Sequence, residues 1–328
     1  MNPYSDVPSQ QKRLEEALAA FQRDYSILSP RIRTLTYTPK CDLKKVTLRL
    51  HFPALRQGNA TVSELVDSIY QFIVPFCLPR SDVQRVRDQY GIVSVDEFMI
   101  KTSRLEQQAV GLFKRAHRLT NRNGEAGELL LYILTEWLLA APQLLAKMSL
   151  KTNPEMPIHG SDGVHVRYCS TQSKLLLYWG ESKLYSDIGD AINSAVKSIE
   201  KSLSSTSLDH EIELVKRYID FSNMEENARN AILSYLDPFD ENYNERQDII
   251  TCLIGFDFEK FSQIAQEDDP ENTFRLLAEK KLEEISVTLT NTLQKRNLEH
   301  KEIEFFFFPV PSVQELRNLF QKKIGWND

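Results

Sequence analysis

Three strongly apolar runs in the second half of the chain place the tightest constraint on its fold. Runs of this kind, without alternation, fit strands that are buried on both faces. Helical patterns separate them, and the predicted order from residue 121 onward is α-β-β-β-α-β-α-β-α. The chain is therefore predicted to be an α/β (mixed α+β) protein with a central mixed sheet flanked by helices. The runs are KLLLYWGESK (Lys174 to Lys183), DIITCLIGFDF (Asp248 to Phe258) and EIEFFFFPV (Glu302 to Val310).

The organisation along the chain suggests two parts. Residues 1–120 form a predicted N-terminal α+β region in which KKVTLRLHF (Lys44 to Phe52) alternates like a strand. Residues 121–328 hold the apolar strands, with an acidic helical insertion at about 205–245. Within this second part, a helix is expected from Glu125 to about Leu145, followed by a short strand near KMSLKT. By elimination, the N-terminal region and the insertion are the expected docking surfaces for a partner.

Composition excludes several classes of protein. The net charge of -6 argues against general affinity for polyanions, although a local basic groove remains compatible with it. The four cysteines lie far apart without a CxxC pair, which disfavours zinc and disulfide frameworks. The N-terminal segment has no apolar core of a signal peptide, and the run from Leu129 to Ala146 is interrupted by Glu136 and Pro142. A cytoplasmic protein that does not enter the membrane is expected.

A pair of charges stands at the end of the first apolar strand. Glu181 and Lys183 are two residues apart, so their side chains project to the same face. Burying both costs free energy unless they have partners, and mutual pairing would be a purely structural explanation. Asp162 precedes the neighbouring strand, between glycines, and an antiparallel hairpin would bring it beside Glu181. Two converging carboxylates favour Mg²⁺ or Mn²⁺, beside which Lys183 could orient water or stabilise charge on a phosphate.

A third acid would come from the helix in RNGEAGELLLYILTEW. Glu125 and Glu128 are three residues apart and share one arc of this helix. Glu125 lies in the first turn and could simply complement the helix dipole, so Glu128 is the favoured ligand and Glu125 its rival. His159 and His165 flank Asp162 and are possible auxiliary ligands or bases, with loop hydrogen bonding as the alternative.

Together, a helix acid, a strand aspartate and a Glu-x-Lys strand end resemble the pattern of the PD-(D/E)XK nuclease superfamily, and the element order matches its restriction-endonuclease-like core. The segments RNGEAGELLLYILTEWLL, HGSDGVHV, YWGESKLYSD and EIEFFFFPVPSVQELRNLF further resemble the HamA family, the nuclease subunits of the Hachiman antiphage defence system. This resemblance covers about residues 120–328. It implies a DNA nuclease held with a helicase of the HamB type, and it matches Asp162, Glu181 and Lys183 to the catalytic positions.

Positive charge for DNA binding has two candidate sources. Basic residues precede the helix of Glu128, and two lysines lie on the strand expected after it. They could line a DNA groove or belong to a solvated helix face. A nuclease-like module that only docks on and regulates the helicase is the alternative function. The candidate DNA-contacting residues are Lys114, Arg115, Arg118, Lys147 and Lys151.

Overall fold

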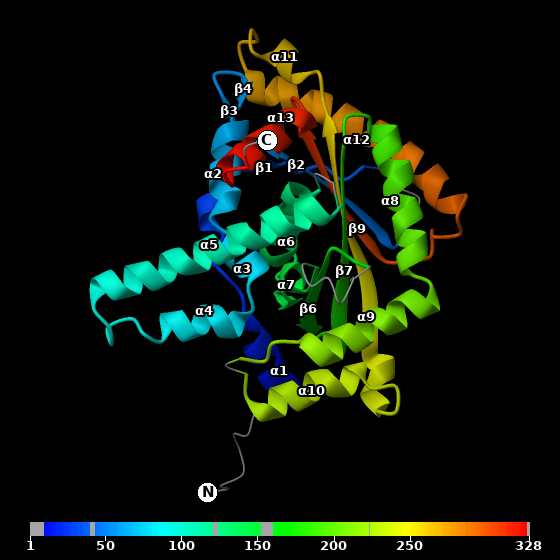
Figure 1. Ribbon diagram of the computed structural model, residues 1–328. Helices are drawn as coiled ribbons and strands as arrows, with labels where there is room; N and C mark the ends of the chain where they lie inside the picture. The colour runs from blue at the N-terminus through cyan, green and yellow to red at the C-terminus, as the bar shows by residue number, and fades with distance from the viewer. Residues whose placement is uncertain (1–9, 40–42, 121–123, 152–159, 223, 327–328) are drawn as a thin grey trace, which may run out of the picture.

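The computed structural model describes residues 10–39, 43–120, 124–151, 160–222 and 224–326, and its centre is a seven-stranded sheet (Figure 1). The strand order is β1-β2-β9-β8-β7-β6-β5. The inner strands β2, β9, β8 and β7 are parallel, whereas β1, β6 and β5 join the two edges antiparallel. The strands are β1 (Ile32–Thr34), β2 (Val46–Pro53), β5 (Gln143–Leu145), β6 (Gly163–Cys169), β7 (Lys174–Tyr185), β8 (Arg246–Asp257) and β9 (Ile303–Val310).

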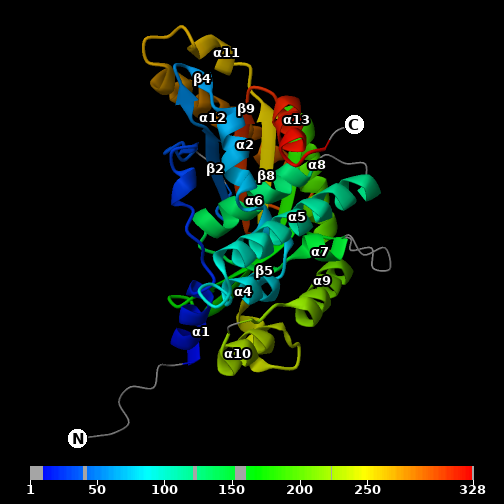
Figure 2. The ribbon, with the colours of Figure 1, turned by 60° about the vertical axis from the view of Figure 1, so that its left-hand side comes forward.

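Helices cover both faces of this sheet, which confirms the predicted fold class. Along β9, Phe305 and Phe307 enter one apolar cluster, while Phe306 and Phe308 enter the cluster on the opposite face. All four rings are buried, as expected for a strand enclosed on both sides. The first cluster lies under α8 (Ile188–Ser202) and α12 (Pro270–Gln294). The second lies under α2 (Val62–Tyr70), α6 (Glu125–Leu138) and α13 (Val313–Lys323), as Figure 2 shows from the side.

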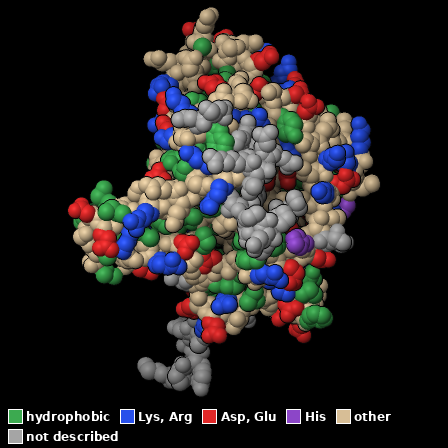
Figure 3. All heavy atoms as spheres, viewed as in Figure 1, with side chains coloured by type: hydrophobic (Ala, Val, Ile, Leu, Met, Phe, Trp, Pro, Cys, Tyr) green, Lys and Arg blue, Asp and Glu red, His purple; other side chains and the backbone are tan. Residues whose placement is uncertain are grey.

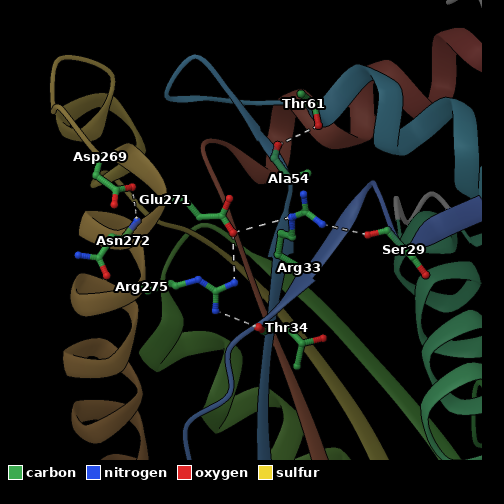
Figure 4. Close-up of polar contacts among 9 residues, drawn as sticks. All are labelled: Ser29, Arg33, Thr34, Ala54, Thr61, Asp269, Glu271, Asn272 and Arg275. Carbon is green, nitrogen blue, oxygen red and sulfur yellow. Dashed lines mark hydrogen bonds and ion pairs between the residues drawn. The ribbon is translucent and has the colours of Figure 1, made fainter.

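The N-terminal region contributes to the same sheet. Strand β2 pairs in parallel with β9, and β1 pairs with β2. Polar contacts also join β1 to the start of α12 (Figure 4): Arg275 donates to the carbonyl of Thr34 at 3.3 Å, and Glu271 lies between Arg275 and Arg33. The functional division at residue 120 stays a prediction, but the sheet and its cores cross this position.

Two helices of the N-terminal region form an arm that projects from the body (Figure 1, left). They are α4 (Arg80–Arg87) and the long α5 (Val95–Thr120). The smaller elements of this region are α1 (Gln10–Ala19), the 3-10 turn η1 (Ser26–Leu28), the hairpin β3 (Leu55–Arg56) and β4 (Asn59–Ala60), and α3 (Ile73–Cys77).

The segment expected as an insertion is helical and stands between α8 and β8. It contains α9 (Ser205–Tyr218), α10 (Glu226–Leu236) and the 3-10 turn η2 (Glu241–Glu245). Ile212 and Val215 of α9 are buried in the cluster under α8, so this helix packs against the body rather than standing clear of it. The short helix α11 (Phe261–Ile264) follows β8.

The region after α6 differs from the prediction. The helix ends at Leu138 instead of near Leu145, because Ala140 has a positive φ of 50° and Pro142 disfavours helix at the residue before it. Strand β5 follows at once and pairs with β6. The segment expected as a strand near KMSLKT begins instead as helix α7 (Lys147–Lys151). Among the described residues, no helix is long and apolar enough to cross a membrane.

Candidate active site

Asp162 lies directly opposite the charged end of β7. Gly163 begins β6 and pairs with Gly180, so Asp162 falls beside Glu181. The amide of Asp162 donates to the carbonyl of Gly180 at 2.6 Å, and the amide of Ser182 donates to Oδ2 of Asp162 at 2.8 Å. The carboxylate of Asp162 is thus held by the main chain of the strand that carries Glu181.

Glu181 and Lys183 form a close ion pair on the face of β7 covered by α8. Their side chains are 12% and 19% exposed, so solvent still reaches both. Burial raises the pKa of Glu181, and the charge of Asp162 adds to this increase, while Lys183 opposes it. Burial alone would lower the pKa of Lys183, but attraction to Glu181 and Asp162 holds that pKa above its ordinary value. Lys183 is therefore a charged ammonium at neutral pH.

Two further residues meet Glu181 that the sequence patterns did not indicate. Ser198 of α8 hydrogen-bonds Glu181, and Cys252 of β8 is its register partner. The thiol of Cys252 is fully buried, and burial raises its pKa, with the charge of Glu181 adding to the effect. Only the tertiary packing of α8 and β8 against β7 brings these side chains to the charges, so local spacing carried no signal for them.

Helix α6, which carries the two helix acids, packs on the opposite face of the strand. A Cβ on Gly127 of α6 would lie 3.0 Å from Leu184 and 3.2 Å from the hydroxyl oxygen of Ser182. Residues 182 and 184 alternate with 181 and 183, so α6 covers the face away from the ion pair.

Glu128 raises the pKa of Cys77 on α3, after the larger effect of burial, and Glu125 lines a small cavity with Arg317. Among the described residues, no three acidic, histidine or cysteine side chains lie close enough to hold a metal ion together. The choice between Glu125 and Glu128 stays a prediction.

The histidines have different outcomes. His165 is buried on the α6 face, where its Nδ1 lies 2.9 Å from the carbonyl oxygen of Ala141 and its ring centroid lies 5.7 Å from that of Tyr132. Burial lowers its pKa, so it is a neutral side chain packed away from the Asp162 face. His159 lies outside the described residues.

The candidate DNA-contacting residues are also divided. Lys114 and Arg115 lie on α5, and Lys114 donates to the carbonyl of Gly325 at 2.8 Å. The side chains of Arg118 and Lys151 lie outside the described residues. The prediction that Lys147 lies on a strand and lines a groove is wrong. Lys147 is on α7, and its ammonium is buried against Glu211.

The segment matched by a family model includes every strand of the central sheet and the candidate site. A family model described as HamA matches residues 32–324, which include Asp162, Glu181 and Lys183. No curated protein shows a significant match to the chain. Since the matched segment spans nearly all of the 328 residues, the chain belongs to the HamA family of Hachiman defence proteins.

Proposed function

We propose that this protein is a metal-dependent DNA nuclease of the PD-(D/E)XK type, acting in the cytoplasm as the effector of a defence complex controlled by a helicase of the HamB type. The observation that supports it is the convergence of Asp162, Glu181 and Lys183 on one face of the sheet. Two oxygen ligands for a metal ion and a positive charge beside them suit metal-dependent hydrolysis of a phosphodiester.

The residues present fit Mg²⁺ or Mn²⁺. Mg²⁺ is commonly held by only one or two protein carboxylates, and substrate phosphate and water oxygens fill the remaining positions. Asp162 and Glu181 supply two such carboxylates, and the raised pKa of Glu181 reflects burial and repulsion that a cation would relieve. When bound, the cation would neutralise phosphate charge and lower the pKa of a coordinated water.

The protein's own groups then have separate tasks. The Ser182 amide fixes the carboxylate of Asp162, and the ion pair with Lys183 orients Glu181. In hydrolysis, a bond forms from a water oxygen to phosphorus, the phosphorus bond to a sugar oxygen breaks, and that oxygen takes up a proton. Lys183, charged and half-buried, stabilises the negative charge that develops on the phosphate during this exchange.

The arm of α4 and α5 supports a docking role for the N-terminal region. Its tip exposes Tyr90, Ile92, Val95, Met99 and Ile100, with Ile92 79% exposed. Figure 3 shows hydrophobic side chains at the tip of this arm among both acidic and basic ones. An apolar patch with mixed charge favours a protein partner over nucleic acid. We expect Ile92→Ser with Met99→Ser to weaken helicase association in co-purification while leaving the fold intact.

Plasmid cleavage in Mg²⁺, alone and with the helicase, tests the catalytic proposal. Lys183→Ala, Glu181→Gln and chelation with EDTA should each abolish cutting, whereas Lys216→Ala, which removes a surface ion pair with Glu213, should not. Cutting only in the presence of the helicase would establish control by the partner.

Intact helicase binding without any Mg²⁺-dependent cutting of DNA or RNA would refute the enzyme and favour the alternative, a non-catalytic module that regulates the helicase. The observation that favours this alternative is that, among the described residues, no three acidic, histidine or cysteine side chains are grouped closely enough to hold a metal ion.

A further inference from the structure

A second buried ion pair lies immediately beside Asp162. Lys147 of α7, Glu211 of α9 and Ser161, the residue before Asp162, are 2%, 4% and 4% exposed. They come from three segments that are distant in sequence, and only the folded chain brings them together. A lysine and a glutamate buried to this extent require extensive compensation for their lost hydration.

The compensation is supplied by the main chain of Ser161. The ammonium of Lys147 lies 2.5 Å from Oε2 of Glu211 and donates to the carbonyl oxygen of Ser161 at 2.8 Å and to its hydroxyl at 2.9 Å. The Ser161 amide donates to Oε1 of Glu211 at 3.2 Å, and its hydroxyl donates to Oε2 at 3.1 Å. The amide, the carbonyl and the hydroxyl of one residue are thus all bonded to the same ion pair.

Gly160 shows how closely the carboxylate approaches the chain here. Its φ is +150°, and a Cβ at this position would lie 1.5 Å from Oε1 of Glu211. The contact with the Ser161 amide therefore requires a glycine before it. A side chain at residue 160 would displace the carboxylate or the segment.

A buried ion pair is weak evidence for stability, because well-packed apolar side chains often stabilise a core equally well. Apolar side chains could not, however, bind both polar groups of a main-chain unit. Asp162 is the next residue, and its other side is held by Gly180 and Ser182. The backbone carrying its carboxylate is thus fixed from two directions.

We propose that Glu211 and Lys147 are positioning residues for Asp162: through Ser161 they hold its carboxylate beside Glu181, where the two could share a divalent cation. This inference rests on the proposed nuclease function. It gives α9 a role in the active site, in addition to any docking role of the insertion to which it belongs. The effect on metal affinity should exceed the effect on cleavage at saturating metal, because neither residue touches the substrate.

Mn²⁺ binding measured on the full chain by calorimetry tests this without relying on activity. Glu211→Gln and Lys147→Met are expected to weaken Mn²⁺ binding at least tenfold. They should also raise the Mg²⁺ concentration for half-maximal cleavage by a similar factor, with a smaller loss of kcat at saturating Mg²⁺. Gly160→Ala, which removes no charge, should show the same split because it displaces Glu211.

Two control variants separate positioning from loss of stability. Asp248→Asn disrupts another partly buried ion pair, the one between Asp248 and Arg246. Asp248 lies on β8, four residues before Cys252, the register partner of Glu181. Glu213→Gln removes an exposed charge from α9 itself. Both should leave Mn²⁺ affinity unchanged, and thermal unfolding of every variant shows whether it is folded.

Unchanged Mn²⁺ affinity in folded Glu211→Gln and Gly160→Ala proteins would overturn the proposal and leave the pair a structural role only. An equal loss of affinity in Asp248→Asn would overturn it too. Failure of the wild-type chain itself to bind Mn²⁺ and to cut DNA would instead refute the nuclease function, and the positioning role would fall with it.

Discussion

Phe52 provides a test of whether the N-terminal region and the rest of the chain unfold as one body. It lies on β2, in the region before residue 120, and is fully buried. Its ring packs against Phe274 of α12, with the centroids 4.4 Å apart. One aromatic pair therefore joins the two parts of the chain through the core.

The expected cost of Phe52→Ala follows from this burial. Truncating a buried phenylalanine to alanine typically costs about 3–5 kcal/mol. That is a large part of the roughly 5–15 kcal/mol by which folded proteins are stable. With an unfolding m-value near 3 kcal/mol per M of urea, which is at the upper end for small proteins, the midpoint should move down by about 1–1.7 M.

The tryptophans make the assay selective. All three, Trp137, Trp179 and Trp326, lie after residue 120, so the fluorescence signal comes from side chains of that part. If the shared sheet makes the chain one cooperative unit, Phe52→Ala shifts the fluorescence midpoint by the full amount. Phe239→Ala, at a side chain that is 98% exposed, is the matched control and should shift nothing.

The contrary result is equally clear. A fluorescence midpoint that stays in place, while circular dichroism shows an earlier partial loss of helix, would mean that residues 1–120 unfold separately. The sheet pairing of β2 with β9 would then contribute little to cooperativity, and the predicted division at residue 120 would be a true folding boundary.

Three further outcomes are expected. Burial and, after it, the charge of Arg49 lower the pKa of His51 from 6.5 to about 3, so below pH 6.5 the unfolded chain binds a proton that the folded chain excludes. The free energy of unfolding should therefore fall below pH 6.5, by about 2 kcal/mol at pH 5. Urea titrations of His51→Gln should show a shallower pH dependence. Gly255→Ala would put a Cβ 2.4 Å from Leu184, so it should cost about 1–3 kcal/mol in urea unfolding. If the clash is the cause, the same substitution should cost less in a Leu184→Ala background than in the wild-type chain. Burial raises the pKa of the Cys77 and Cys252 thiols, so both should resist thiol reagents until the chain unfolds, and modification of either at the rate of an exposed thiol would contradict the packing around it.

The parts of the structure that the sequence predicted well depend on strand periodicity. Side chains of a regular strand alternate between its two faces, so the common face of Glu181 and Lys183 follows from their spacing. The apolar runs that became β7, β8 and β9 are continuous because helices cover both faces, and this is visible in composition. The proximity of Asp162 to Glu181 follows in turn from a short hairpin between two adjacent strands.

The parts that the sequence did not predict depend on contacts between distant elements. Helical periodicity predicts that Glu125 and Glu128 share one arc of the helix, but it does not predict on which face of the sheet α6 packs. The predicted end of α6 lies too far along the chain, because the apolar residues continue past Leu138 into β5. The burial of Lys147 is not visible in the sequence, because its partner, Glu211, is 64 residues away.

The two buried Lys–Glu pairs differ in a way that separates their roles. The Lys147–Glu211 pair is enclosed, and its hydrogen bonds end on the main chain of Ser161. The Lys183–Glu181 pair is partly open to solvent and stands beside another carboxylate. A pair that is sealed and fully bonded holds its surroundings in place, whereas a pair with solvent access can exchange partners for a cation and a phosphate. Exposure, more than residue type, is therefore the basis of the two proposed roles, chemistry for Lys183 and positioning for Lys147.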